Sequence, residues 1–433
     1  MELFNSVESN VKSYCRTFPE VFHKAKGAKL FNESGEEYID FFAGAGALNY
    51  GHNNGYIKER LINYIQSDAI THGLDMYTKA KREFIQKFVD SILTPRDLNY
   101  KLQFCGPTGT NAVEAALKLA RKVKKRTNIF SFMGAFHGMS MGSLAATSGI
   151  GSRQGAGVPL DNVTFIPYPV GCMGNIDTIQ YIETILTDDH SGIEKPAAII
   201  VETTQAEGGI NVTSVEWLRS LSELCNKHDI LLICDDIQVG CGRTGEFFSF
   251  ERAGIVPDMV VLSKSISGYG LPMSLLLLKP ELDIWTPGEH NGTFRGNQMA
   301  FVAATAALEY RENTNMDKGT KEREEFIKNF LNERIKPLHK DFDIRGIGMI
   351  WGIDFSLLGG EKSSKEIVTR CFDNNLIIER AGREDVVVKI MPPLNIEMDV
   401  LEEGCKILEK SIIEFLSNSE YGIAIESKIE ETV

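Results

Sequence analysis

The chain has 433 residues, of which 43% are hydrophobic and 24% charged, a balance typical of a globular protein with two domains. Its net charge of -13 leaves no basic surplus for the phosphates of nucleic acid, so we expect no nucleic-acid partner. No apolar run reaches the roughly 18 residues that span a bilayer, and the N-terminus MELFNSVESN lacks the apolar core of a signal peptide. The eight cysteines are scattered without a CxxC pair, which indicates reduced thiols. We therefore expect a cytoplasmic protein without membrane association and without a resident metal.

Short apolar segments alternate with helical patterns over residues 51–300, after a mixed region at residues 1–50 that holds the candidate strands KLFN and EEYIDF. Such alternation is the signature of βαβ units, and it predicts an α/β fold with a mostly parallel central sheet flanked by helices. An amphipathic segment at residues 214–228 is one of the predicted helices. The apolar segments are NIFSF (128–132), NVTFIPY (162–168), AAIIVE (197–202), ILLICDD (230–236) and DMVVLSK (258–264).

The C-terminal third has a different pattern. Residues 300–330 predict one long helix, and a second helix is predicted near residues 399–416. Between them, IRGIGMIWGIDF (344–355) and VVVKIMPPLNI (386–396) are candidate strands. We expect residues 1–50 and 301–416 to form a smaller α+β domain beside a large domain at residues 51–300. The polar residues 417–433 are expected to be a loose tail.

A candidate phosphate site lies at residues 105–121, CGPTGTNAVEAALKLAR, where a glycine-containing turn leads into an amphipathic helix. Glycine permits close backbone approach, and the first N–H groups of a helix favour an anion. The turn is not a P-loop, because no Gly-Lys-Ser/Thr follows. An ordinary turn before a helix has the same appearance.

The segment GAFHGMS (134–140) places an aromatic ring and a histidine after a predicted strand. A flat cofactor needs an aromatic face such as that of Phe136. The plainer alternative is that Phe136 is a core residue and that His137 is a hydrogen-bonded loop residue.

Three successive predicted strands end in ionisable residues, namely Glu202, Asp235 and Lys264. Ligands bind at the carboxyl ends of strands in open parallel sheets, so the three side chains are expected to share one cleft. A lysine that is partly desolvated can lose its proton near neutral pH and act as a nucleophile. Taken singly, a strand-terminal carboxylate is more often a helix cap.

The chain resembles the class III (ω-amino) pyridoxal-phosphate aminotransferases of fold type I over roughly residues 15–415. The resemblance is carried, in this order, by GTNAVEAALKLAR, FHG, VETTQAEGG, CDDIQVGCGRTG, PDMVVLSK and GTFRGN. Within that family, FFAGAGALNYGHNN, ITHGLDM, LSKSISGYGLPM and HNGTFRGN are similar to diaminobutyrate–2-oxoglutarate transaminases, which supply L-2,4-diaminobutyrate for ectoine and related pathways. The resemblance implies small-molecule amino-acid and 2-oxo-acid substrates and the cofactor pyridoxal 5'-phosphate.

The resemblance also implies roles for individual residues. Lys264 would be the Schiff-base lysine and would shuttle the proton of the substrate carbon, while Asp235, rather than its neighbour Asp236, would pair with the pyridine nitrogen. Thr293 matches a threonine that reaches the phosphate from a neighbouring subunit, so a homodimer or higher homo-oligomer is expected. The other cofactor contacts implied are Thr108, Gly109, Thr110, Phe136, His137, Glu202, Ile237 and Gln238.

The sequence departs from the family pattern at several positions. Asn111 replaces the usual glutamate of the phosphate turn, and Met139 replaces an arginine found in many 4-aminobutyrate transaminases, which argues against 4-aminobutyrate as the preferred donor. Glu207 matches a gating glutamate that pairs with an arginine, but Lys389 stands in the arginine's place. Both are expected to bind substrate, although a lysine lacks the bidentate fork of arginine. Nearby Arg380 and Arg383 are alternative carboxylate ligands.

Three other functions fit parts of the sequence. Within the family, the amine donor could be ornithine, acetylornithine or 4-aminobutyrate. The βαβ pattern alone also fits a nicotinamide-dependent dehydrogenase, but its glycine fingerprint is broken in GAGALNYG by Asn49. A catalytically inactive relative is disfavoured because every residue type that contacts the cofactor is present.

Overall fold

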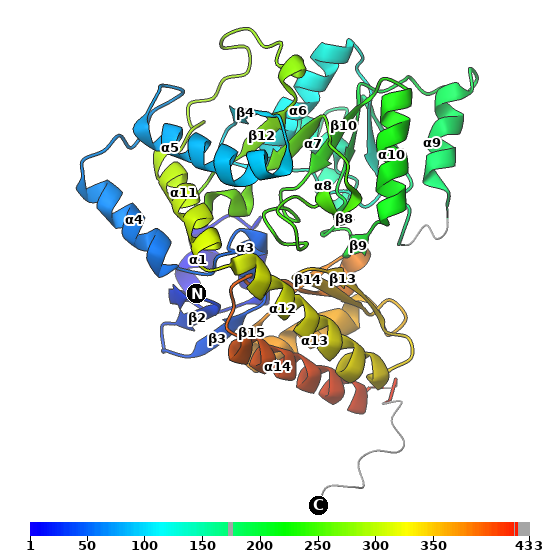
Figure 1. Ribbon diagram of the computed structural model, residues 1–433. Helices are drawn as coiled ribbons and strands as arrows, with labels where there is room; N and C mark the ends of the chain where they lie inside the picture. Colours follow the sequence, from blue (N-terminus) through cyan, green and yellow to red (C-terminus); the bar gives the residue numbers. More distant parts are fainter. Residues whose placement is uncertain (172–175, 420, 423–433) are drawn as a thin grey trace, which may run out of the picture.

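The computed structural model describes residues 1–171, 176–419 and 421–422, and its largest element is a seven-stranded sheet (Figure 1). The strands from β11 to β6 pair in parallel, whereas β12 pairs antiparallel with both of its neighbours. This confirms the predicted mostly parallel sheet. The strand order is β4 (Lys101–Phe104), β12 (Leu275–Leu278), β11 (Met259–Leu262), β10 (Leu231–Asp235), β7 (Ala198–Val201), β5 (Ile129–Phe132) and β6 (Val163–Ile166).

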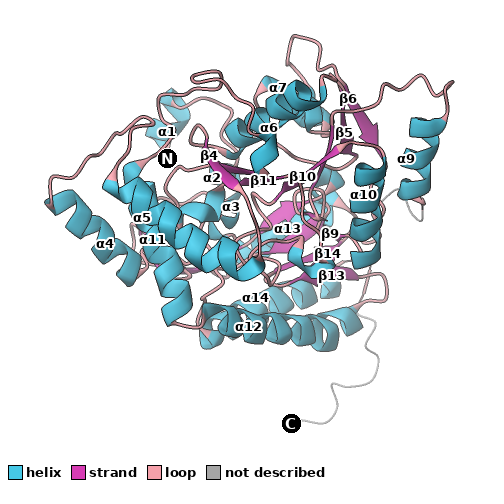
Figure 2. Cartoon of the chain, turned by 45° about the horizontal axis from the view of Figure 1, so that its top comes forward, coloured by secondary structure: helices cyan, strands magenta, loops and turns pink. Residues whose placement is uncertain are grey.

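Helices cover both faces of this sheet (Figure 2). In β10, Ile233 packs with α6 on one face, whereas Leu232 packs on the other face in a cluster that includes α10, α5 and α11. Because both faces are buried, the strands are continuous apolar runs rather than alternating ones. These helices are α5 (Lys79–Phe88), α6 (Gly109–Lys124), α10 (Val215–Lys227) and α11 (Gln298–Asn313).

Of the remaining helices before β7, some precede the first strand of the central sheet in the chain and the others connect its strands. Several helices begin at a side-chain cap, as in α10, where Ser214 Oγ accepts a hydrogen bond from the backbone N–H of Trp217 at 3.1 Å. The helices are α1 (Glu2–Val7), α2 (Tyr14–Thr17), α3 (Ala43–Gly46), α4 (Gly55–Gln66), α7 (Met141–Ala146), α8 (Ile150–Arg153) and α9 (Thr178–Thr187).

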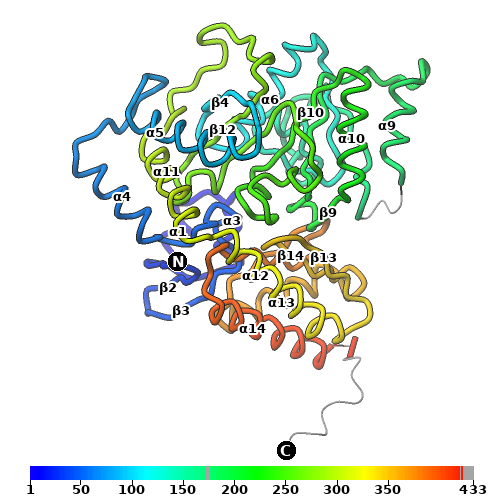
Figure 3. Tube along the Cα trace, in the orientation of Figure 1, coloured from blue at the N-terminus to red at the C-terminus, as the bar shows by residue number. Residues whose placement is uncertain are grey.

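Segments from the two ends of the chain lie side by side, as the blue and orange-to-red parts of Figure 3 show. One small sheet has the order β1 (Phe22–Lys26), β2 (Lys29–Asn32), β3 (Glu37–Asp40) and β15 (Leu376–Ile377). A second has the order β13 (Asp343–Ile347), β14 (Ile350–Asp354), β17 (Val387–Ile390) and β16 (Glu379–Ala381). The division into a large domain at residues 51–300 and a small domain from both chain ends stays a proposal that this pairing supports.

The other elements of this region are the strands β8 (Thr204–Gln205) and β9 (Asn211–Val212) and the helices α12 (Met316–Phe330), α13 (Glu361–Asp373) and α14 (Met398–Ser417). The predicted single helix over residues 300–330 is wrong, because α11 ends at Asn313 and α12 begins at Met316. Asn315 between them has a φ of 48°, the left-handed conformation that asparagine tolerates and a helix does not. Most of the predicted tail, residues 420 and 423–433, lies outside the described residues.

The described cysteines are free thiols, and all except Cys15 are buried. No helix within residues 1–171, 176–419 and 421–422 is long and apolar enough to cross a bilayer.

Gly268 closes the turn that follows β11 and lies against α11. Its φ is +71°, and a Cβ built there would overlap the Cβ of Ala307. We therefore expect Gly268→Ala to lower the free energy of unfolding by about 3 kcal/mol, through left-handed backbone strain and overpacking together. Gly254→Ala is the matched control, because Gly254 has a φ of +64° and no described atom within 4 Å of its built Cβ. The control should lose only about 1 kcal/mol. Equal shifts of the thermal unfolding midpoint in the two variants would contradict the packing argument.

Candidate active site

One cavity opens at the carboxyl ends of β7, β10 and β11, which are neighbours in the sheet. Glu202 follows the end of β7, Asp235 ends β10 and Lys264 follows β11, and all three line the cavity. Parallel pairing of the three strands brings these side chains together from positions far apart in the sequence.

Most of the site residues predicted from the sequence line this cavity. They are Gly109, Thr110, Phe136, His137, Glu202, Glu207, Asp235, Ile237, Gln238 and Lys264. Thr108, Lys389 and Thr293 are not in its lining. The sequence reasoning missed Gly138, Thr204, Ala206 and Val239, which also line it. All four lie in motifs that carry the family resemblance, Gly138 in FHG, Thr204 and Ala206 in VETTQAEGG, and Val239 in CDDIQVGCGRTG, so the motifs could have indicated them.

Lys264 begins a short 3-10 turn, Lys264–Ser267, and has a φ of 49°. A non-glycine residue costs roughly 1–2 kcal/mol in this region, and such strain is concentrated at functional sites. The turn is fixed by Ser265 Oγ, which donates to the carbonyl of Gly46 at 2.6 Å. Burial lowers the pKa of Lys264, and the negative charge of Glu207 offsets only part of this lowering. A lowered pKa increases the fraction of neutral amine that can act as a nucleophile or base.

Asp235 and His137 form a buried pair, with 2.7 Å between Asp235 Oδ2 and His137 Nδ1. The other oxygen of Asp235 accepts the backbone N–H of Ile237 at 3.1 Å. Burial alone would lower the pKa of His137, but the Asp235 carboxylate raises it overall. The Nε2 atom of His137 has no hydrogen-bond partner among the described residues.

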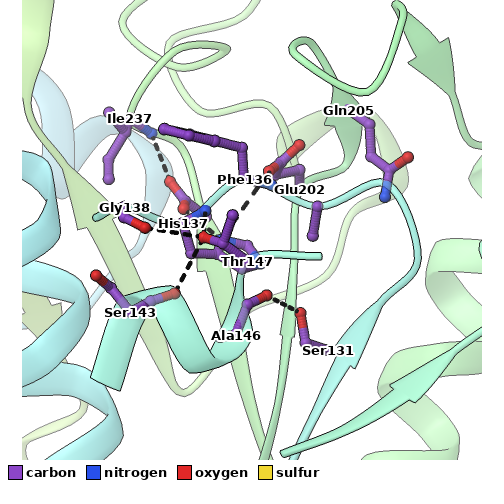
Figure 4. Close-up of polar contacts among 12 residues, drawn as sticks. Ser131, Phe136, His137, Gly138, Ser143, Ala146, Thr147, Glu202, Gln205 and Ile237 are labelled. Atoms are coloured by element: carbon purple, nitrogen blue, oxygen red, sulfur yellow. Dashed lines mark hydrogen bonds and ion pairs between the residues drawn. The ribbon is translucent and has the colours of Figure 1, made fainter. Parts of the chain in front are cut away.

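Thr147 fixes the loop that carries His137 (Figure 4). Its Oγ1 accepts the backbone N–H of His137 at 2.9 Å and lies 3.0 Å from the carbonyl oxygens of Gly138 and Ser143. On the neighbouring strand end, Glu202 Oε1 accepts the N–H of Phe136 at 2.9 Å. Burial raises the pKa of Glu202 to about 8, so this carboxyl can carry a proton near neutral pH.

The two adjacent aspartates of the CDDIQ motif have different environments. Asp236 does not line the cavity, and its Oδ2 accepts the backbone N–H of Ser249 at 2.9 Å. Burial raises the pKa of Asp236 to about 7. Of the two, only Asp235 therefore presents its carboxylate to a ligand.

The turn before α6 places backbone N–H groups at the cavity. Thr108 is the N-cap, and Asn111 Oδ1 accepts from Thr108 N at 3.4 Å and from Thr108 Oγ1 at 2.9 Å. Asn111 thus caps the turn in place of the family's glutamate. A Cβ on Gly109 would lie 2.7 Å from Ile237 Cδ1, so the close approach of this turn to Ile237 requires glycine.

Lys389 lies behind the cavity wall and is fully buried. Its Nζ is 2.8 Å from Glu207 Oε1 and 2.7 Å from Glu379 Oε1. Burial alone would raise the pKa of Glu207, but the Lys389 ammonium lowers it to about 2. Glu379 was not predicted from the sequence as a site residue.

The other cationic and exposed candidates lie elsewhere. Arg380 is paired with Glu361 at 3.7 Å and with Asp385 at 3.3 Å. Arg383 makes no ion pair within the described part of the chain, and its Nη2 lies beside Gly134, two residues before Phe136. Thr293 is solvent-exposed and outside the cavity of its own chain.

A sequence model of the family described as "Aminotransferase class-III" matches residues 12–412. The chain belongs to the class III aminotransferases. Proteins named "Diaminobutyrate--2-oxoglutarate transaminase" are similar to it over nearly their full length. That of Streptomyces coelicolor is 53% identical, covering 96% of this chain and 98% of the relative, and that of Bordetella parapertussis is 50% identical, covering 97% of each. The Halalkalibacterium halodurans protein is 52% identical, covering 95% of this chain and 96% of the relative.

Solved structures show the same fold at lower identity. The ornithine aminotransferase of Toxoplasma gondii superposes with a TM-score of 0.82 at 23% identity, covering 96% of this chain and 93% of that one. A Bacillus anthracis aminotransferase gives a TM-score of 0.82 at 24% identity, covering 95% and 97%. This aminotransferase therefore has the fold type I architecture of pyridoxal-phosphate enzymes.

The cavity fits the cofactor of a class III aminotransferase, pyridoxal phosphate. It offers a half-buried amine at Lys264, a buried carboxylate at Asp235, helix N–H groups at Gly109 and Thr110, and apolar surface from Phe136 and Ile237. Two buried polar atoms in its lining, Nε2 of His137 and Oε1 of Gln238, have no described partner. The amine, the carboxylate and the helix N–H groups fit the aldehyde, the ring nitrogen and the phosphate of this group, and the enzyme depends on pyridoxal phosphate.

Proposed function

We propose that the enzyme moves the 4-amino group between L-2,4-diaminobutyrate and 2-oxoglutarate. In the biosynthetic direction, L-glutamate and L-aspartate 4-semialdehyde would give 2-oxoglutarate and L-2,4-diaminobutyrate. One observation carries this proposal. Relatives that are named for this activity are at least 50% identical to the chain over nearly its whole length. The cavity around Lys264 supports the dependence of this reaction on pyridoxal phosphate.

We assign cofactor binding to residues of the cavity wall. Lys264 would hold pyridoxal phosphate covalently, and Asp235 would pair with its ring nitrogen. Phe136 and Ile237 would contact the ring, Gln238 would hydrogen-bond the phenolic oxygen, and the turn at Thr108, Gly109 and Thr110 would bind the phosphate. His137 and Glu202 hold Asp235 and the Phe136 loop in place, as their hydrogen bonds indicate.

When bound, pyridoxal phosphate supplies an electron-withdrawing ring that stabilises negative charge on the carbon that bears the amine. Lys264 would take the proton from that carbon and return it. Its lowered pKa and its position in the cavity wall suit it to this transfer. Asp235 would keep the ring nitrogen protonated.

We assign the carboxylates of 2-oxoglutarate to Lys389, uncovered when Glu207 turns away, and to Arg383 near the Phe136 loop. Because Thr293 is exposed and outside the cavity, its predicted phosphate contact requires a second subunit, and we propose a homodimer. We also propose that the enzyme is cytoplasmic and that it supplies L-2,4-diaminobutyrate to an ectoine-type pathway.

A panel of amine donors tests the proposed substrate. Purified enzyme loaded with pyridoxal phosphate should transfer the amino group from L-2,4-diaminobutyrate to 2-oxoglutarate with a kcat/KM at least about tenfold above that for ornithine, acetylornithine or 4-aminobutyrate. Ornithine differs from L-2,4-diaminobutyrate by one methylene, acetylornithine also by an acetyl group on its second amine, and 4-aminobutyrate lacks that amine. Formation of L-glutamate is the measurement. Preference for 4-aminobutyrate would overturn the assignment.

A further inference from the structure

The cavity wall at Glu207 is backed by an unusual group of charges. Lys389 on β17 lies opposite Glu379 on β16 in the antiparallel register, so the two side chains meet on one face of the sheet. Glu207 reaches the same ammonium from the loop after β8. We call Glu207, Lys389 and Glu379 the acid–lysine cluster.

The cluster contains two carboxylates and one ammonium. Lys389 donates a hydrogen bond to Glu207 at 2.8 Å, but its 2.7 Å contact with Glu379 Oε1 has poor hydrogen-bond geometry. Lys389 is 0% exposed and Glu379 is 6% exposed, so solvent does not compensate the second carboxylate. Arg380, the next residue on β16, is paired with Glu361 and Asp385 and does not neutralise Glu379. With both glutamates ionised, the cluster carries a net negative charge.

We propose that Glu379 is a specificity-determining positioning residue that acts through Lys389, making the wall at Glu207 anionic so that the site selects amino donors with a second ammonium group. This inference rests on the proposed function. L-2,4-diaminobutyrate that reacts through its 4-amino group carries an ammonium and a carboxylate at its far end, whereas 4-aminobutyrate carries only a carboxylate. A Glu207–Lys389 pair alone would be neutral and would not distinguish the two.

The size of the effect follows from Coulomb's law. The charge of Glu379 lies one residue behind the wall and acts through an effective dielectric constant of about 20, partly screened by solvent. It should change the selectivity between L-2,4-diaminobutyrate and 4-aminobutyrate about tenfold. The charge acts in opposite senses on the two half-reactions. It favours the cationic end of the donor, and it opposes the carboxylate of 2-oxoglutarate.

The pH dependence has a definite sign. Burial raises the pKa of Glu379 to about 7, in spite of Lys389. Above this pH the ionised Glu379 makes the wall negative, so preference for the diamino donor rises and the KM for 2-oxoglutarate also rises. Below it, protonated Glu379 leaves a neutral wall that accepts the 2-oxo acid more readily.

The other groups that face Glu379 do not reproduce this change. Lys389 holds the pKa of Glu207 at about 2, and the carboxylates raise the pKa of Lys389 despite its burial. Tyr14 on α2 faces the cluster, and burial together with Glu379 and Glu207 raises its pKa to about 12. Lys264, whose pKa burial lowers and Glu379 raises, takes part in the reaction of both donors and therefore cancels in the ratio of their kcat/KM values.

The test compares the cofactor-loaded wild type with Glu379→Gln between about pH 6 and about pH 8. In the wild type, the ratio of kcat/KM for L-2,4-diaminobutyrate to that for 4-aminobutyrate should rise with pH. In Glu379→Gln the ratio should be about tenfold lower at the upper pH and independent of pH. Glu379→Asp, which keeps the charge, should restore the pH dependence. Glu361→Gln is the matched control, because it removes a nearby carboxylate outside the cluster.

A binding measurement provides a readout that does not depend on turnover. Glutarate, a dicarboxylate without a reacting group, should bind Glu379→Gln with a dissociation constant about tenfold lower than the wild type at the upper pH, measured by calorimetry. Equal losses for both donors, with an unchanged affinity for glutarate, would overturn the inference and leave Glu379 a purely structural residue. If the wild type does not use L-2,4-diaminobutyrate, the proposed function fails, and the glutarate measurement still decides the role of Glu379.

Discussion

Lys264→Ala is expected to lower kcat for transamination by at least about 10⁵-fold. In the proposed function the side chain supplies both the covalent attachment of the cofactor and the base that moves the substrate proton, and no other amine lines the cavity among the described residues. The long-wavelength absorbance of the lysine-bound cofactor should also disappear, while the phosphate turn at α6 is unchanged. Single-turnover kinetics and visible absorbance are the measurements.

Two comparisons separate the roles of Lys264. Lys264→Arg keeps a positive charge but removes an amine that can lose its proton, so it should be as inactive as the alanine variant. Lys279→Ala removes a half-buried ion pair with Asp258 outside the cavity lining and should leave kcat within about twofold. Activity in Lys264→Arg would mean that the site needs a charge at this position rather than a proton-transferring amine.

Four parallel strands of the central sheet could be predicted because each is a short apolar run buried on both faces. The predicted segments at residues 128–132, 197–202, 230–236 and 258–264 contain β5, β7, β10 and β11 respectively. The break between α11 and α12 could not be predicted, because the helical pattern of apolar residues continues on both sides of Asn315. A single left-handed residue decides that the helix ends, and its φ is not visible in hydrophobic periodicity.

The same contrast holds for the active site. Glu202, Asp235 and Lys264 could be placed in one cleft, because the carboxyl ends of parallel strands meet at one edge of the sheet. Glu379 could not be found in this way. Its pairing with Lys389 depends on the register of β16 and β17, and a shift of one residue would turn Arg380 toward the cluster instead. Similarly, the CDDIQ motif contains two acids, and the residues that bind Asp236, above all Ser249, explain why only one of them faces the cavity.

Asp235→Asn is expected to raise the dissociation constant for pyridoxal phosphate about a hundredfold and to lower kcat by about a hundredfold to a thousandfold. Asparagine has the same shape, but its neutral amide cannot keep the ring nitrogen protonated. The change also removes the carboxylate that raises the pKa of His137, so this fully buried imidazole should become neutral. Titration of the apoenzyme with the cofactor, followed by absorbance, measures the affinity, and steady-state kinetics measures kcat.

Asp236→Asn is the matched control for this prediction, since the two aspartates are adjacent and both are buried. Asp236 accepts its hydrogen bonds from Ser249 rather than from a ligand, and an amide oxygen can accept the same backbone N–H. The control should therefore change the cofactor affinity by less than about threefold. If the two variants lost affinity equally, the loss would come from disturbance of the β10 terminus. A loss confined to Asp235→Asn would show that a carboxylate facing the cavity is what retains the cofactor, because the two substitutions differ only in the direction in which the side chain points.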